Sequence, residues 1–252
     1  MFPKGTRLEK ANLQNGTIAF AMRPGGPSCI LFLHGLGCSK ESFMDAFTHP
    51  YFDATATLLA PDFLGHGDSD RNVVYSYDLQ SQAELIRELL DRLGIVQIAI
   101  VAHSMANVVG LALAQFDLEV LGFYCLEGNL IAEDCTLSAR VAKNAERQFV
   151  EKIYPLTKEK FVGKIDIDVP SADPIALYRM SKSLTDHCLG YRQLSMFLEL
   201  PISKTYLHGE VSASLPVLSK LSGIDVISVP NAGHFLMNDN PGFVYSAIAE
   251  RL

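Results

Sequence analysis

Three residues that lie far apart in the chain have the side chains required for nucleophilic catalysis: Ser104, Glu127 and His234. A serine hydroxyl becomes a strong nucleophile when a neighbouring imidazole removes its proton, and a carboxylate fixes the tautomer of that imidazole and stabilises its protonated form. Each of the three follows an apolar run typical of a buried strand. Because open α/β sheets hold ligands beyond the carboxyl ends of their strands, we expect the three side chains to meet at one sheet edge.

The segment around Ser104 predicts a sharp turn between a strand and a helix. The apolar run 98–101 ends in Ala102-His103-Ser104-Met105-Ala106, and apolar residues at helical spacing follow from Val108. Such a turn holds its central residue in a strained conformation, and it requires small side chains two positions before and after. Ala102 and Ala106 meet this requirement. An ordinary turn of small residues is the alternative interpretation.

With two neighbouring motifs, this segment resembles the α/β-hydrolase family, whose turn is usually Gly-x-Ser-x-Gly; alanine replaces both glycines here. The run His34-Gly35-Leu36-Gly37 is similar to the family's loop that faces the reacting carbonyl. The run 61–69 resembles the family's Asp-x-x-Gly-His-Gly-x-Ser loop, which we expect to be structural. The resemblance implies that the backbone N–H groups of Leu36 and Met105 form an oxyanion hole.

The general base is predicted from a loop near the C-terminus. The run Pro230-Asn231-Ala232-Gly233-His234-Phe235 follows an apolar strand and is similar to the family's loop that carries the base. His234 also fits the family's chain order of nucleophile, acid and base. His208 is the main rival, because it lies at a strand end. His103 adjoins the nucleophile and is expected to point elsewhere.

The acid departs from the family's usual pattern. Most relatives carry Gly-x-x-Asp after the penultimate strand, and Ser212 stands at that aspartate's position in this chain. Glu127 directly follows the strand 120–126 and is the predicted substitute, as in some haloalkane dehalogenases. A carboxylate at the end of a buried strand needs a charged or hydrogen-bonding partner, and His234 would be that partner. Glu210 and Asp134 remain alternatives.

The elements that must position these residues alternate between short strands and helices. This alternation predicts an α/β fold of the α/β-hydrolase type, a mostly parallel eight-stranded sheet with helices on both faces. Strands are expected at 7–12, 17–23, 28–33, 57–60, 95–101, 120–126, 205–208 and 225–229, the first two as an antiparallel hairpin. Helices are expected at 79–93, ended by Gly94, and after Asn240-Pro241. Residues 131–200 lack clear strands and are interpreted as an inserted helical cap on a core of residues 1–130 and 201–252.

Composition excludes several other classes of protein. The formal net charge of −7, with scattered basic residues, argues against nucleic acid as a partner. No apolar run is long enough to span a bilayer and no secretion signal is recognisable, so we expect no membrane partner. Five cysteines without CxxC spacing favour a cytoplasmic location and no metal site. The predicted chemistry requires no cofactor.

These observations predict a serine hydrolase that cleaves a carboxylic ester or thioester of a small to medium acyl group through an acyl-enzyme on Ser104. The alternatives are hydrolysis of a carbon–carbon bond in a diketone by the same three residues, and a non-catalytic ligand receptor on the same scaffold. Apolar side chains of the cap are expected to line the substrate pocket: Phe149, Tyr154, Phe161, Tyr178, Met180, Met196 and Phe197.

Overall fold

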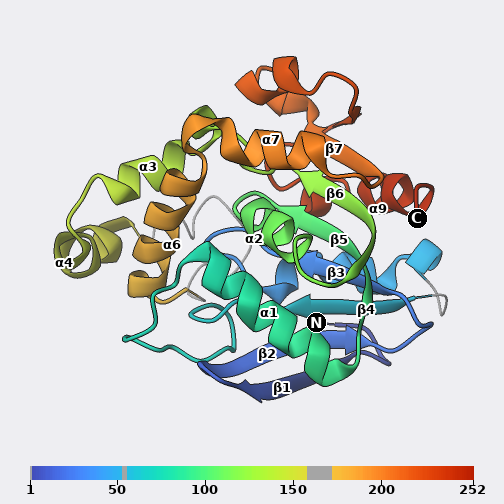
Figure 1. Ribbon diagram of the computed structural model, residues 1–252, viewed down its shortest axis with the longest axis horizontal. Helices are drawn as coiled ribbons and strands as arrows, with labels where there is room; N and C mark the ends of the chain where they lie inside the picture. The colour runs from blue at the N-terminus through green and yellow to red at the C-terminus, as the bar shows by residue number, and fades with distance from the viewer. Residues whose placement is uncertain (1, 53–55, 158–171) are drawn as a thin grey trace.

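The computed structural model describes residues 2–52, 56–157 and 172–252 (Figure 1). The strands are β1 (Arg7–Leu13), β2 (Gly16–Arg23), β3 (Cys29–Leu33), β4 (Thr57–Pro61), β5 (Gln97–His103), β6 (Glu119–Leu126), β7 (Lys204–Gly209) and β8 (Asp225–Val229). The α-helices are α1 (Leu79–Leu93), α2 (Ala106–Leu113), α3 (Thr136–Ala142), α4 (Glu146–Gln148), α6 (Pro174–His187), α7 (Arg192–Glu199), α8 (Leu236–Asp239) and α9 (Pro241–Ala249). Short 3₁₀ or π-helical segments are η1 (Lys40–Thr48), η2 (Pro50–Phe52), η3 (Ala132–Asp134), η4 (Phe149–Ile153), η6 (Leu189–Tyr191), η7 (Glu210–Ser212) and η8 (Pro216–Lys220).

The strands form one mostly parallel sheet in the order β1-β2-β4-β3-β5-β6-β7-β8. β1 and β2 pair as the predicted antiparallel hairpin, and β2 also pairs antiparallel with β4. The pairs from β4 through β8 are parallel. This arrangement confirms the predicted fold class. It also brings the carboxyl ends of β3, β5, β6 and β7 to one edge of the sheet.

Alternating side chains of the central strands divide the core into two layers. On β3, Cys29, Leu31 and Leu33 face one cluster, whereas Ile30 and Phe32 face the other. The first cluster includes residues of α1 and α2, which lie in front of the sheet in Figure 1. The second cluster packs η1, α8 and α9 on the opposite face. A strand buried on both faces is apolar throughout, which explains why β3 reads as an uninterrupted apolar run.

The two helices predicted with defined ends occur where the sequence places them. α1 begins after Asp78, whose carboxylate accepts a hydrogen bond from the backbone N–H of Gln80. It ends at Gly94, whose φ of 69° is the left-handed conformation common after helices. α9 begins at Pro241, and the side chain of Asn240 caps it by accepting from Phe243.

Between β6 and β7, the described residues contain helical elements only. Figure 1 shows α3, α4 and α6 grouped on one side of the sheet. α7 packs instead on the core, where the ring centroids of Phe197 and Phe123 are 5.8 Å apart. The division into a core and an inserted cap stays a prediction. No helix in the described ranges is both long and apolar enough to cross a bilayer.

Candidate active site

The turn from β5 into α2 presents Ser104 at the sheet edge. Ser104 has a φ of 55°, which is unusual for a residue with a side chain. Its backbone N–H donates to Leu126 O at 3.0 Å, so the turn is fixed to the neighbouring strand β6. Ala102 and Ala106 are both fully buried, which explains why these two positions require small residues. The strained turn therefore holds the hydroxyl clear of its own strand and helix.

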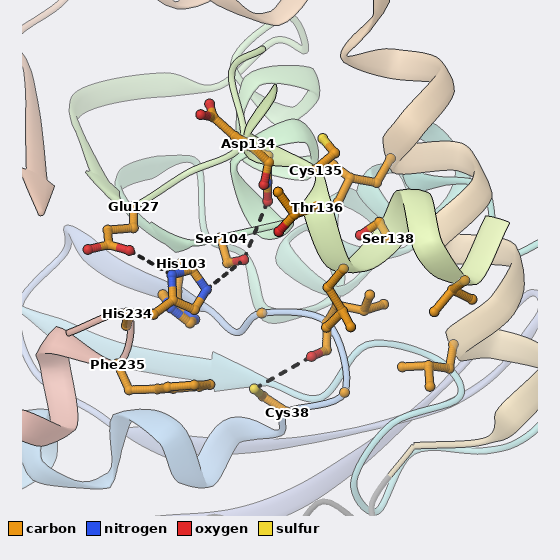
Figure 2. Close-up of a pocket in the computed structure, with 18 of the residues that line it drawn as sticks. Cys38, His103, Ser104, Glu127, Asp134, Cys135, Thr136, Ser138, His234 and Phe235 are labelled. Atoms are coloured by element: carbon orange, nitrogen blue, oxygen red, sulfur yellow. Dashed lines mark hydrogen bonds and ion pairs between the residues drawn. The ribbon is translucent and has the colours of Figure 1, made fainter. Parts of the chain in front are cut away.

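Ser104, His234 and Glu127 form one chain of hydrogen bonds (Figure 2). His234 Nε2 lies 3.2 Å from Ser104 Oγ, and His234 Nδ1 lies 2.7 Å from Glu127 Oε2. An ionised carboxylate only accepts hydrogen bonds, so Nδ1 carries the proton and Nε2 is left to accept from the hydroxyl. The structure brings together the three residues that the sequence singled out. This is the geometry of a nucleophile, a base and an orienting acid.

The Glu127 carboxylate is built into the sheet edge. Glu127 follows β6 with a φ of 41°, and its side chain is 3% exposed. Its Oε1 accepts from the backbone N–H of Gly209 at 2.9 Å. Burial acts to raise the pKa of Glu127, but hydrogen bonds from His234 and Ser212 outweigh burial and hold the pKa below its usual value. Glu127 is therefore ionised at neutral pH, as an orienting acid must be.

The rivals for base and acid have other contacts. The ring of His208 is buried, and its Nδ1 lies 2.9 Å from Gly209 O. Glu210 is exposed and accepts from the backbone N–H of Asn231 at 3.0 Å. Ser212, at the position of the family's usual aspartate, hydrogen-bonds to Glu127 instead. Ser212, which stands where relatives have the acid, thus stabilises Glu127, the substitute acid.

The two predicted oxyanion-hole residues flank the hydroxyl in the fold. Leu36 lies in the turn after β3 and lines the cavity next to Ser104, and Met105 immediately precedes α2. The first N–H groups of a helix have no acceptor within the helix, so the Met105 amide is available to a ligand. The turn at Leu36 is anchored because Gly37 N–H donates to His66 Nε2 at 3.2 Å. His66 belongs to the loop 61–69, which has the structural role expected from its motif.

A cavity of about 420 Å³ opens beside Ser104. This volume falls in the usual range for small-molecule sites. Phe149 and Tyr154 line it as predicted, together with Leu36, Leu177 and Phe235. The segment between β6 and β7 also contributes apolar lining residues, namely Cys135, Leu137, Val141, Ala172 and Leu184.

Four of the predicted lining residues lie elsewhere, which corrects that prediction. Tyr178 packs beside Phe149, but its hydroxyl donates to Asn144 O at 2.8 Å, away from the cavity. Met180 and Phe197 belong to the core cluster that includes α1 and α2, and Met196 packs against that cluster. Phe161 lies outside the described residues.

Sequence reasoning missed Asn129. Asn129 is buried, and its Oδ1 lies 3.4 Å from Ser104 Oγ. Its Nδ2 donates to Asp134 O at 2.9 Å, which fixes the oxygen of the amide toward the hydroxyl. The available signal was its place two residues after Glu127, at the same strand end.

His103 was wrongly expected to point away from the site. Its ring lies against that of His234, with centroids 4.8 Å apart, and Figure 2 shows the two rings side by side. His103 Nε2 lies 2.9 Å from the carbonyl oxygen of His234. The residue before the nucleophile therefore contacts the loop that carries the base.

Asp134 and two cysteines border the site. Burial raises the pKa of Asp134 to about 6, although the N–H groups of Leu130 and Ile131 donate to its carboxylate. Cys135 and Cys188 are buried neighbours joined by a side-chain hydrogen bond. Among the described residues, no group of three or more His, Cys, Asp or Glu side chains is arranged to hold a metal ion.

Comparison with protein families matches residues 30–247 to the alpha/beta hydrolase family. The chain belongs to this family. Alpha/beta hydrolases of known structure superimpose on nearly its whole length. An N-acyl homoserine lactonase has a TM-score of 0.77 at 18% identity, covering 97% of this chain and 95% of that one. An esterase from Thermogutta terrifontis has a TM-score of 0.74 at 19% identity, covering 97% of each chain.

Curated relatives match a shorter part of this alpha/beta hydrolase. An uncharacterized protein of Mycobacterium tuberculosis is 31% identical over 125 residues, which are 49% of this chain and 36% of the relative. The sn-1-specific diacylglycerol lipase of Mus musculus is 32% identical over 108 residues, 42% of this chain and 34% of the lipase. The matched regions thus span about a third of these relatives' length.

Proposed function

We propose that this alpha/beta hydrolase is a serine hydrolase that cleaves a carboxylic ester or thioester of a small to medium acyl group. The observation that carries the proposal is the hydrogen-bonded chain from Ser104 through His234 to Glu127, at the rim of an apolar cavity. Each of these groups has the partner that its role in acyl transfer requires.

The proposed reaction has two halves. His234 Nε2 removes the Ser104 proton as Oγ attacks the acyl carbon, and the Leu36 and Met105 N–H groups stabilise the resulting oxyanion. His234 then gives the proton to the departing alcohol or thiol, which leaves an acyl ester on Oγ. A water molecule, deprotonated by the same imidazole, attacks that ester and releases the acid and the free serine. No metal or organic cofactor enters either half.

The lining of the cavity supports an uncharged acyl group. Among the described residues that line it, none is lysine or arginine, and its carboxylates are Glu127 and Asp134. An anionic acyl group would meet these carboxylates without a compensating cation, whereas an alkyl or aryl group would bury apolar surface. The lactonase, esterase and lipase named among the similar proteins also act on ester bonds, as their names state.

The test is a panel of p-nitrophenyl esters and acyl thioesters of increasing chain length, assayed with wild type and Ser104→Ala. We expect wild type to turn over neutral acyl groups, to reject dicarboxylate monoesters, and to lose activity by about 10⁶-fold in Ser104→Ala. A fluorophosphonate should label wild type and leave Ser104→Ala unlabelled. Labelling without turnover of any ester or thioester would overturn the proposal. Cleavage of a diketone in place of the esters would favour the carbon–carbon hydrolase, and absence of labelling would favour the receptor.

A further inference from the structure

His103 has no part in the reaction proposed above, yet it is a buried polar group in direct contact with His234. It ends β5, immediately before Ser104, and it is 1% exposed. Its ring packs against both the His234 ring, at 4.8 Å, and the Phe235 ring, at 5.2 Å, measured between centroids. A polar ring in this place requires an explanation, because burying an imidazole costs free energy unless it is hydrogen-bonded.

The hydrogen bond of His103 defines its tautomer. A carbonyl oxygen only accepts, so the 2.9 Å contact between His103 Nε2 and His234 O requires the proton on Nε2. Nδ1 then carries a lone pair, and it has no partner among the described residues. It faces the oxyanion loop (residues 34–37), because a Cβ added to Gly35 would lie 2.8 Å from it. The ring thus contacts both the oxyanion loop and the loop that carries the base, residues 230–235, called the base loop below.

The ring also stays neutral beside the base. Burial, and next to it the charge of His234, lower the pKa of His103 to about 3, whereas the hydrogen bond to the His234 backbone and the charge of Glu127 act more weakly to raise it. A neutral donor supports the His234 backbone and adds no positive charge when that imidazole is protonated during the reaction.

Other hydrogen bonds also anchor the base loop. Gly233 N–H donates to Asp239 at 2.8 Å and Asn231 N–H donates to Glu210 at 3.0 Å, and both bonds are exposed. The hydrogen bond from His103 reaches the His234 backbone from the strand end next to Ser104. It ties the last residue before the nucleophile to the base itself.

We propose that His103 is a positioning residue: its Nε2–H holds the His234 backbone, and thereby sets the imidazole at hydrogen-bonding distance from both Ser104 and Glu127. A misplacement of about 1 Å far from the reacting atoms can reduce a rate 100-fold, so one such bond has a measurable effect. The kinetic consequence rests on the proposed function, but the geometric one does not.

The experiment compares His103→Phe, which keeps a buried ring without a donor, with His103→Gln, whose amide N–H reaches about the position of Nε2. We expect His103→Phe to lower kcat about 10- to 100-fold with little change in KM, and His103→Gln to recover most of the loss. Thermal unfolding of both variants serves as the folding control.

A spectroscopic measurement requires no substrate. The proton shared by His234 Nδ1 and Glu127 should give a low-field ¹H resonance in wild type that His103→Gln retains and His103→Phe loses, while Glu127→Gln identifies the signal. Retention of the resonance and of kcat in His103→Phe would overturn the inference. So would equal losses in both variants that follow their thermal stability. If wild type hydrolyses no ester, the resonance and the rate of fluorophosphonate labelling decide the question separately from the proposed function.

Discussion

At the scale of single residues, the assignment of the acid makes the sharpest prediction. Glu127→Gln keeps the shape of the side chain but can place an N–H toward His234 Nδ1, which favours the wrong tautomer of the base. We expect kcat to fall about 10⁴-fold, as when the acid of a serine protease becomes an amide. Steady-state kinetics on the best ester of the panel measures this.

Glu210→Gln is the matched control for that substitution, since Glu210 is the exposed rival at the neighbouring strand end. It should keep activity within about tenfold of wild type. The substitution only removes the charge that accepts from the Asn231 N–H, and the His234 imidazole keeps its hydrogen bond with Glu127. If Glu210→Gln were inactive and Glu127→Gln active, the acid would be wrongly assigned.

Asp134 makes a prediction about pH. Its pKa is raised to about 6 by burial, so the folded state binds this proton more tightly than the unfolded state does. The carboxyl therefore costs no stability well below its unfolded pKa, and its full cost is present above about pH 6. Asp134→Asn keeps an acceptor for Leu130 and Ile131 and removes this cost.

We expect Asp134→Asn to raise Tm by a few degrees at about pH 8 and to have little effect at about pH 4. Differential scanning calorimetry at both pH values tests this. A shift that is equal at both would show that the ionisation of Asp134 does not govern the stability there.

At the scale of secondary-structure elements, the strands and the positions of Ser104, Glu127 and His234 were predictable for one physical reason. Parallel strands end at a common edge, so Ser104 and Glu127, directly after the neighbouring strands β5 and β6, must lie near each other, and the loop that carries His234 starts from the same edge. The helix ends were predictable because Asp78, Gly94 and Asn240 satisfy backbone groups locally.

The lining of the cavity was not predictable in the same way. Leu177 lines the cavity, its neighbour Tyr178 packs beside Phe149, and Met180 enters the core, although all three are apolar residues of α6. Their roles depend on how α6 is rotated about its own axis, which sequence periodicity does not fix. The contact of His103 with His234 likewise joins residues 131 positions apart.

The junction of β6, β7 and the base loop makes a prediction about packing between elements. A Cβ on Gly209 would lie 2.3 Å from Ala232 O and 2.5 Å from Gly233 O. Gly209→Ala should therefore push the base loop away from Glu127, lower the free energy of unfolding by about 1–3 kcal/mol, and reduce kcat. Urea denaturation and kinetics measure the two effects. Gly242→Ala is the control, because nothing lies within 4 Å of its added Cβ. If Gly209→Ala kept the stability and kcat of wild type, as Gly242→Ala should, the packing argument would be contradicted.

At the scale of the whole molecule, a buried ion cluster joins the segment after the oxyanion loop to the loop 61–69. Lys40 Nζ lies 2.8 Å from Asp62 Oδ2 and 2.7 Å from Asp68 Oδ2, and the side chains of Lys40 and Asp62 are 2% and 0% exposed. Burial alone would lower the pKa of Lys40, but its hydrogen bonds with Asp62 and Asp68 outweigh burial and raise the pKa above its usual value. The cluster thus favours the charged form of Lys40, whose charge opposes the rise that burial causes in the pKa of Asp62.

Lys40→Met tests how far the fold depends on this cluster. The substitution leaves Asp62 buried without its cation, which typically costs about 3–5 kcal/mol, and we expect that loss in urea denaturation. The double variant Lys40→Met with Asp62→Asn should regain part of it, because the uncompensated charge is then gone. Lys182→Met breaks an exposed ion pair, with side chains 59% and 60% exposed, and should change stability by less than about 1 kcal/mol. If Lys40→Met were as mild as Lys182→Met, Asp62 would be accommodated by solvent or by protonation, and the cluster would not hold the two loops together.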